Sequence, residues 1–157
     1  MAQLSNFTYD EIHIGQTARY SKTINFRDIQ LFAAASGDVN PVHLDADFAA
    51  TTPFEERIAH GMLTGALFSA ALAMELPGPG TIYLGQSLKF RLPVKIGDTI
   101  SIILEVTDKR DKRRLVSLDC KAFNQHDKLV ASGVAEVMAP SEKLVIDRPA
   151  LPQIEIL

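Results

Sequence analysis

The sequence predicts an α+β domain in which an antiparallel sheet encloses one long apolar helix. Residues 58–76, "IAHGMLTGALFSAALAMEL", are apolar on nearly every side of a helix. The chain that follows contains strand-like runs separated by turn residues. Because a helix that is apolar all round must be covered by other elements, we expect the strands to form a curved sheet around it.

Composition and charge narrow the class of protein. A length of 157 residues suits one folded domain, and 46% hydrophobic with 22% charged residues is typical of soluble globular proteins. The net charge of -3 is spread along the chain without a basic block, which argues against nucleic acid as a partner. The single cysteine, Cys120, cannot form an internal disulfide, so we expect a reducing compartment, the cytoplasm. The N-terminus has no signal-peptide pattern and the longest apolar stretch contains polar residues, so we expect no membrane span.

The elements before the apolar helix follow from capping and turn residues. Residues 17–24 alternate weakly and favour a strand, after which Asn25 can cap a helix over residues 26–36. Gly37 comes next, and glycine is the usual residue just past a helix C-terminus. Residues 45–51 favour a second, short helix that a proline closes.

The elements after the apolar helix follow from alternation. Apolar and polar side chains alternate along the second and third runs, which is the period of a half-buried antiparallel strand. We expect a four-stranded antiparallel meander over residues 81–94, 99–109, 114–125 and 128–139. The remaining chain is rich in proline and has no clear period. The predicted domain is therefore residues 1–139, and residues 140–157 are predicted to be a tail or linker.

The stretch "SGDVNPVH", residues 36–43, concentrates polar residues just after the first predicted helix. Asp38 and His43 lie on a segment that Pro41 stiffens, and Pro41 also biases Asn40 towards extended geometry. A carboxylate and an imidazole on one short rigid loop can both reach a single water or substrate proton, as general acid–base catalysis requires. Alternatively, Asp38 and Asn40 are turn formers and His43 is an ordinary loop histidine; from residue types alone this alternative is the more common.

A second feature is the glycine at the start of the apolar helix. The N–H groups of a first helical turn are unpaired and carry the positive end of the helix dipole. The N–H of Gly61 could therefore hold a carbonyl oxygen that gains negative charge. A glycine that merely eases entry into the helix fits the local sequence equally well. Ser69, about two turns further along, could face the same cavity or simply pack the helix against the sheet.

The other histidines carry weaker signals. His60 suits a contact at the helix start, whereas His13 and His126 suit the surface. The sequence has no Cys/His cluster and no Gly-rich phosphate loop, so neither a metal nor a nucleotide cofactor is expected.

The two features together, "SGDVNPVHLDADFA" and "AHGMLTGALFS", resemble the MaoC-like (R)-specific enoyl-CoA hydratases. The spacing Gly-Asp-x-Asn-Pro-x-His, followed by five residues and an alanine, is rarely met by chance. The resemblance continues through "PGPGTIYLGQSLKFRLPVKIGDTI" and covers roughly residues 10–139. It implies a hot-dog fold, in which an antiparallel sheet wraps around a long central helix. It also implies a homodimer or higher homo-oligomer that binds acyl-CoA in a tunnel near the subunit boundary.

The resemblance also implies roles for individual residues. Asp38 and His43 would activate a water for addition to C3 of a trans-2-enoyl-CoA and deliver a proton to C2, giving an (R)-3-hydroxyacyl-CoA reversibly. The backbone N–H of Gly61 would polarise the thioester carbonyl, and Ser69 would support the Asp38–His43 pair. Asn40 and Pro41 would belong to the substrate loop. No cofactor is implied, because CoA is part of the substrate.

The end of the chain carries a narrower resemblance. The ending "GVAEV", followed by "APSEK" and a Pro-rich run, resembles the N-terminal hydratase domain of bifunctional enoyl-CoA hydratase/phosphate acetyltransferase proteins. This resemblance implies that residues 140–157 are a linker.

Two other functions fit parts of the sequence. One is an acyl-CoA thioesterase on the same fold, in which a carboxylate directs water at the thioester carbon instead of C3. The other is a non-catalytic acyl-CoA-binding or dimerisation module. The Asp-x-Asn-Pro-x-His spacing favours the hydratase over the thioesterase, and an intact acid–base pair argues against a pure binder.

Overall fold

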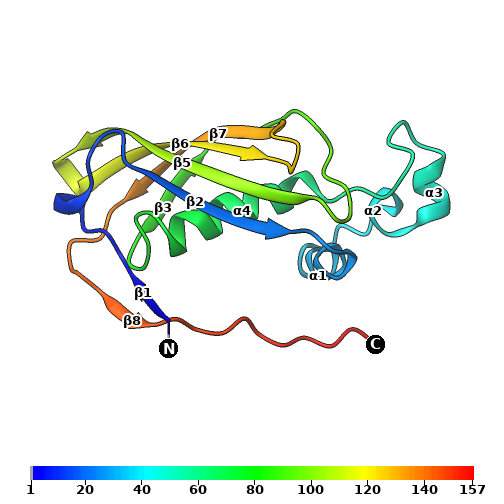
Figure 1. Cartoon of the computed structure of the whole chain (residues 1–157), viewed down its shortest axis with the longest axis horizontal. Helices are drawn as coiled ribbons and strands as arrows, with labels where there is room; N and C mark the ends of the chain where they lie inside the picture. The colour runs from blue at the N-terminus through cyan, green and yellow to red at the C-terminus, as the bar shows by residue number, and fades with distance from the viewer. Residues whose placement is uncertain (1) are drawn as a thin grey trace.

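The computed structural model, which describes residues 2–157, consists of a curved antiparallel sheet with one long helix against its inner face (Figure 1). The sheet has the strand order β2-β5-β6-β7-β3, and a short strand, β4, also pairs with β7. The strands are β2 (Thr17–Thr23), β3 (Ile82–Gln86), β4 (Lys89–Phe90), β5 (Thr99–Arg110), β6 (Leu115–Phe123) and β7 (Leu129–Met138). The predicted α+β class and hot-dog arrangement are confirmed.

Three of the four α-helices lie close to their predicted ranges, and α2 falls where a loop was expected. Helix α1 (Phe26–Ser36) begins at Asn25, whose side chain accepts the N–H of Asp28 while the Asp28 carboxylate accepts the N–H of Asn25. Two short helices follow, α2 (Pro41–Leu44) and α3 (Ala46–Ala50). The central helix α4 (Gly61–Met74) begins three residues later than the sequence suggested, because Ile58 forms a β-bridge with Lys95. No helix among residues 2–157 is long and apolar enough to cross a membrane.

The expected meander holds for three strands only. Strands β5, β6 and β7 are joined in order as antiparallel neighbours. The first predicted run splits into β3 and β4, both of which pair with β7 at the far edge, while β2 takes the edge beside β5. Strand β3 follows α4 along the chain and lies at the edge of the sheet opposite β2, so the first predicted run is not the neighbour of β5.

The core lies between α4 and the inner face of the sheet. Leu67, Phe68 and Leu72 of α4 are buried against the alternate residues of β5 that the sequence predicted to face inward. The opposite side of α4 is not covered within one chain, and Met62 on that side is 56% exposed. The curved sheet therefore covers one side of the helix, and the other side is exposed in a single chain.

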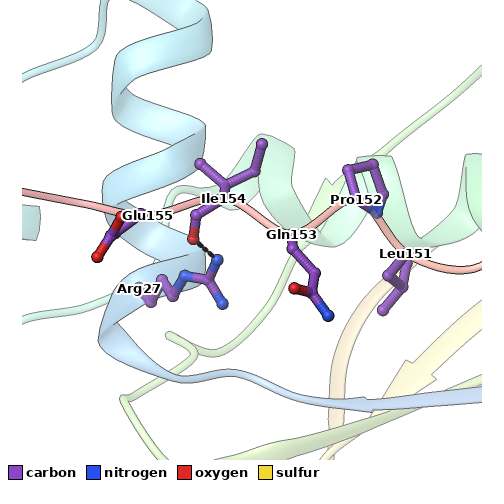
Figure 2. A pocket seen from close by; sticks show the side chains of 6 residues that line it. All are labelled: Arg27, Leu151, Pro152, Gln153, Ile154 and Glu155. Carbon is purple, nitrogen blue, oxygen red and sulfur yellow. Dashed lines mark hydrogen bonds between the residues drawn. The ribbon is translucent and has the colours of Figure 1, made fainter.

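Both ends of the described chain run along the molecule's outside (Figure 1). Strand β1 (Gln3–Ser5) pairs with β8 (Val145–Asp147), a contact that the sequence analysis did not predict. Beyond β8 the chain is extended and passes α1, where Arg27 donates a hydrogen bond to the carbonyl of Ile154 (Figure 2). Two one-turn 3-10 helices, at Tyr9–Glu11 and Lys112–Arg114, complete the elements. The division into residues 1–139 and 140–157 stays a prediction.

Candidate active site

Asp38 follows the C-terminus of α1. Gly37 ends this helix in the left-handed conformation, with φ of 80°, and its N–H donates to the carbonyl of Ala33 at 2.9 Å. The N–H of Asp38 then donates to Ser36 Oγ at 3.2 Å. The side chain of Asp38 is 51% exposed, so the carboxylate is open to solvent and to small molecules.

Asn40 and Pro41 start the turn of helix that carries His43. The N–H of Asn40 donates to Asp38 Oδ1 at 3.2 Å, and Asn40 Oδ1 accepts the N–H of Val42 at 3.1 Å. Pro41 takes the first helical position, where its missing N–H leaves no partner unsatisfied. A loop was expected here, whereas the Asn40 cap followed by Pro41 starts a short helix. In this structure both residues act on the backbone of the site.

His43 presents one ring nitrogen to Asp38. Its Nδ1 lies 2.8 Å from the carbonyl oxygen of Ile58. A carbonyl oxygen only accepts, so Nδ1 carries the proton and Nε2 of the neutral ring holds a lone pair. This Nε2 lies 3.9 Å from Asp38 Oδ2, which is too far for a direct hydrogen bond. Two acceptors at this separation can each accept one hydrogen of a single water molecule.

The N-terminus of α4 lies beside this pair, next to an apolar cavity. The N–H of Gly61 has no acceptor within the described chain. The cavity has a volume of about 290 Å³ and is walled by Ile58, His60 and Gly61 together with apolar residues. It shares Ile58 and His60 with the contacts of His43, since the His43 ring also stacks on His60. The remaining wall residues are Phe54, Ala59, Thr64, Phe90, Leu92, Pro93, Val94 and Val130.

Ser69 lies away from this cluster. It is half buried on α4, eight residues beyond Gly61, which corresponds to about 12 Å along a helix axis. Among residues 2–157 no hydrogen bond joins Ser69 to Asp38 or His43. The structure therefore brings Asp38 close to His43 and places Gly61 next to His60, which contacts both; a supporting role for Ser69 stays a prediction.

His60 is a site residue that the sequence does not single out. Its side chain is buried, its ring stacks on that of His43 with centroids 3.8 Å apart, and its Nε2 lies 2.9 Å from the backbone carbonyl oxygen of Asp38. The only sequence signal was its position directly before Gly61.

Asp38, His43 and His60 have potential metal-ligating atoms within 4.8 Å of one another. The hydrogen bonds of the two imidazoles argue against metal binding at these residues. Each imidazole already directs one N–H at a backbone carbonyl, His43 at Ile58 and His60 at Asp38. One imidazole lone pair and one carboxylate then face each other, fewer ligands than a tetrahedral site needs.

Comparison with known proteins places these features in a family. Residues 10–122 match the model of the MaoC like domain. The chain is 47% identical to an (R)-specific enoyl-CoA hydratase of Aeromonas caviae, over 82% of this chain and 96% of the relative. It is 40% identical to a 3-hydroxybutyryl-CoA dehydratase of Methylorubrum extorquens, over 91% and 90% of the two chains.

A solved structure gives the same result in three dimensions. The R-hydratase PhaJ1 from Pseudomonas aeruginosa, in its unliganded form, is 57% identical and superposes with a TM-score of 0.94, over 99% of both chains. The fold is therefore shared along nearly the whole length of the two proteins.

Proposed function

The chain belongs to the family of MaoC-like domains, and on that premise we propose that Asp38 and His43 are the dyad that hydrates trans-2-enoyl-CoA. The chain is a hydro-lyase that forms (R)-3-hydroxyacyl-CoA, as its relatives' names indicate. The observation that carries the assignment of the dyad is the distance of 3.9 Å between Asp38 Oδ2 and His43 Nε2, beside an apolar cavity.

The geometry suggests how the dyad works. A water held by Asp38 Oδ2 and His43 Nε2 loses one proton to the dyad as its oxygen bonds to C3 of the enoyl group. The electron pair of the C2–C3 double bond moves towards the thioester carbonyl, and C2 then takes a proton from the dyad. No proton is gained or lost overall, and dehydration is the reverse. The two groups share these duties as a coupled pair.

The N-terminus of α4 stabilises the thioester carbonyl of the substrate in this proposal. The free N–H of Gly61 lies at the positive end of the helix dipole, where an oxygen that gains negative charge is stabilised. The neighbouring cavity, at about 290 Å³, is at the small end of ligand pockets. A short enoyl group is therefore the first substrate to test, with the CoA portion outside the cavity.

The experiment is an assay of crotonyl-CoA with the purified chain in the presence of a thiol reagent. Loss of the enoyl absorbance without release of thiol, followed by chiral analysis showing the (R)-3-hydroxy product, is the expected result. Release of thiol would instead identify a thioesterase. No reaction at any chain length, together with binding, would identify a non-catalytic module.

We also propose that the reaction needs no metal or redox cofactor. The support is the pattern of hydrogen bonds around His43 and His60, which leaves too few ligands for a metal. Activity that is unchanged after dialysis against EDTA would agree with this, and loss of activity that zinc restores would contradict it.

A homodimer is the proposed assembly. Strand β3 is at the edge of the sheet, and its residues Ile82, Tyr83 and Leu84 are exposed. The uncovered side of α4, which includes Met62 and Ala66, is apolar as well. Apolar side chains beside an unpaired strand edge are typical of surfaces that another chain covers.

Two finer predictions rest on the sequence alone. The relation to the hydratase domain of the bifunctional hydratase/phosphate acetyltransferase proteins rests on the ending "GVAEV" and "APSEK". The cytoplasmic location rests on the single cysteine. The mass of the intact protein in a cell extract, measured with an antibody against this chain, tests the first.

A further inference from the structure

His60 occupies the N-cap position of α4 but does not cap the helix with its side chain. N-cap side chains usually accept an N–H from the first turn. The residue is instead buried, with only 2% of its surface exposed. The side chain of His60 therefore does not stabilise the start of α4 by capping it.

The side chain of His60 holds the backbone of Asp38. Its Nε2 lies 2.9 Å from the carbonyl oxygen of Asp38, which is 22 residues earlier in the chain, so Nε2 carries the proton. The other nitrogen, Nδ1, is buried and has no hydrogen-bond partner among the described residues. Among the described residues, the contact with the Asp38 carbonyl is the one hydrogen bond of the imidazole, and the same Nε2 lies 4.0 Å from Asp38 Oδ2.

The ring of His60 also fixes that of His43. The two imidazoles are stacked, with centroids 3.8 Å apart and an angle of 27° between their planes. Phe32 lies on the ring of His60, with centroids 4.9 Å apart. These three rings come from α1, α2 and the start of α4, so His60 joins the elements that carry Asp38 and His43.

We propose that His60 is a positioning residue for the hydratase reaction. It sets the distance between the Asp38 carboxylate and His43 Nε2 through one N–H and one ring face. This inference rests on the proposed role of the dyad. His60 is one of the eleven residues that line the cavity, so substrate binding depends mainly on the other ten, whereas the alignment of Asp38 and His43 depends on His60 directly.

Two amide variants separate the donor from the ring. His60→Gln places an amide N–H near the position of Nε2, whereas His60→Asn reaches only the position of Nδ1, and both remove the ring. We expect kcat for crotonyl-CoA to fall by about 10²-fold in His60→Asn, the scale of a 1 Å misplacement, and to recover by about tenfold in His60→Gln. KM is expected to stay within about twofold of wild type in both variants.

Two further proteins complete the set. His60→Phe keeps a ring but has no donor, and we expect it to lose kcat as His60→Asn does. His13→Gln changes an exposed histidine and serves as the control, with kcat and KM as in wild type. Folded His60→Asn and His60→Phe variants with kcat within about twofold of wild type would overturn the inference. A His60→Gln no better than His60→Asn would also overturn it, because the donor would then be unimportant.

A measurement on the wild-type protein covers the case in which the variants do not fold. Long-range ¹H–¹⁵N NMR spectra distinguish the two neutral forms of each imidazole. We expect the proton of His60 on Nε2 and that of His43 on Nδ1, and His60 protonated on Nδ1 instead would refute the inference. Hydration of crotonyl-CoA by the wild type tests the proposed function separately, so its failure is not confused with failure of the role of His60.

Discussion

At the scale of single residues, the direction of each N–H decides what the site can do. Ile58 and Asp38 supply carbonyl oxygens that fix the protons of His43 and His60. His43 Nε2 is thereby left as an acceptor beside a carboxylate. The site therefore combines two acceptors that are ready to take a proton from water.

Variants of the dyad are expected to lose activity and keep their fold. Asp38→Asn removes the carboxylate charge, and His43→Asn retains a donor near Nδ1 for the carbonyl of Ile58 but has no Nε2. We expect each to lower kcat by about 10²–10⁴-fold, the usual contribution of a general acid or base. The double variant should lose little more than the worse single variant, because the two groups act as a unit.

Circular dichroism melts provide the control for the dyad variants. The Asp38 side chain is half exposed, so Asp38→Asn should change the free energy of unfolding by no more than about 0.5 kcal/mol. A folded variant of either residue with a rate near that of wild type would show that the dyad is misassigned.

Cys120 is expected to be inert in the native protein. Burial raises the pKa of its thiol from the ordinary value of 9.0 to about 11. The native state thus keeps the thiol proton between pH 9 and 11, whereas the unfolded chain releases it, so stability falls as the pH rises through this window. Between pH 8 and pH 10, the free energy of unfolding measured in urea should decrease more for wild type than for Cys120→Ala. Equal losses in the two proteins would contradict the assigned pKa.

The sequence predicted Asp38, His43 and Gly61 because they belong to recognisable motifs. In the structure Asp38 lies 3.9 Å from His43, and Gly61 directly follows His60, which contacts both. The sequence could not predict His60 in the same way. The importance of His60 comes from a hydrogen bond to a residue 22 positions away and from a stacked ring, and neither has a local sequence signal.

At the scale of helices and strands, the sequence predicted an element correctly where neighbouring residues determine its start and end. Helix α1 begins at Asn25 and ends at Gly37 as the capping residues predicted. Strand β3 was placed wrongly within the meander because its pairing with β7 depends on the path of the whole chain. Strand β8 has three exposed residues without alternation, and its partner β1 lies at the other end of the sequence, so no local pattern identifies it.

Close packing of β7 against the β3–β4 connection gives a test of this pairing. At Gly133 an added methyl group would overlap the carbonyl oxygen of Ser87, whereas at Gly85 it would meet no atom within 4 Å. We expect Gly133→Ala to destabilise the protein by about 1–3 kcal/mol and Gly85→Ala to change stability by less than about 0.5 kcal/mol. In thermal melts, the destabilisation by Gly133→Ala corresponds to a decrease of at least about 2–4 °C in Tm. Equal melting temperatures would show that β3 and β4 do not pair with β7 as described.

At the scale of the whole molecule, the uncovered apolar side of α4 predicts self-association. The chain mass is 17.2 kDa, and we expect sedimentation to give twice this value for wild type. Leu84→Glu places a charge on exposed edge strand β3 and should shift the mass towards that of one chain. Ile14→Glu, at an exposed position elsewhere, should leave the mass unchanged. A wild type that sediments as a single chain would exclude the proposed dimer.

The composition of α4 predicted that something must cover the helix, and that inference was sound for the buried side only. Leu67, Phe68 and Leu72 lie against the sheet of the same chain. A single sequence contains no information on whether the remaining apolar side is covered by the same chain or by a second copy. For this reason the residue pattern predicted the fold, whereas the homo-oligomer was expected only from the resemblance to a family.

The N–H of Gly61 has a consequence for how such a site can change in evolution. Every residue except proline has a backbone N–H. A substitution at position 61 therefore keeps this donor unless the new residue is proline. A side chain at position 61 would instead change the space between the helix and Phe90, because a Cβ at Gly61 would lie only 3.2 Å from the ring of Phe90. Selection for larger or differently shaped acyl groups can therefore act through the side chain at position 90, which lines the cavity, while the N–H proposed to contact the thioester carbonyl is retained.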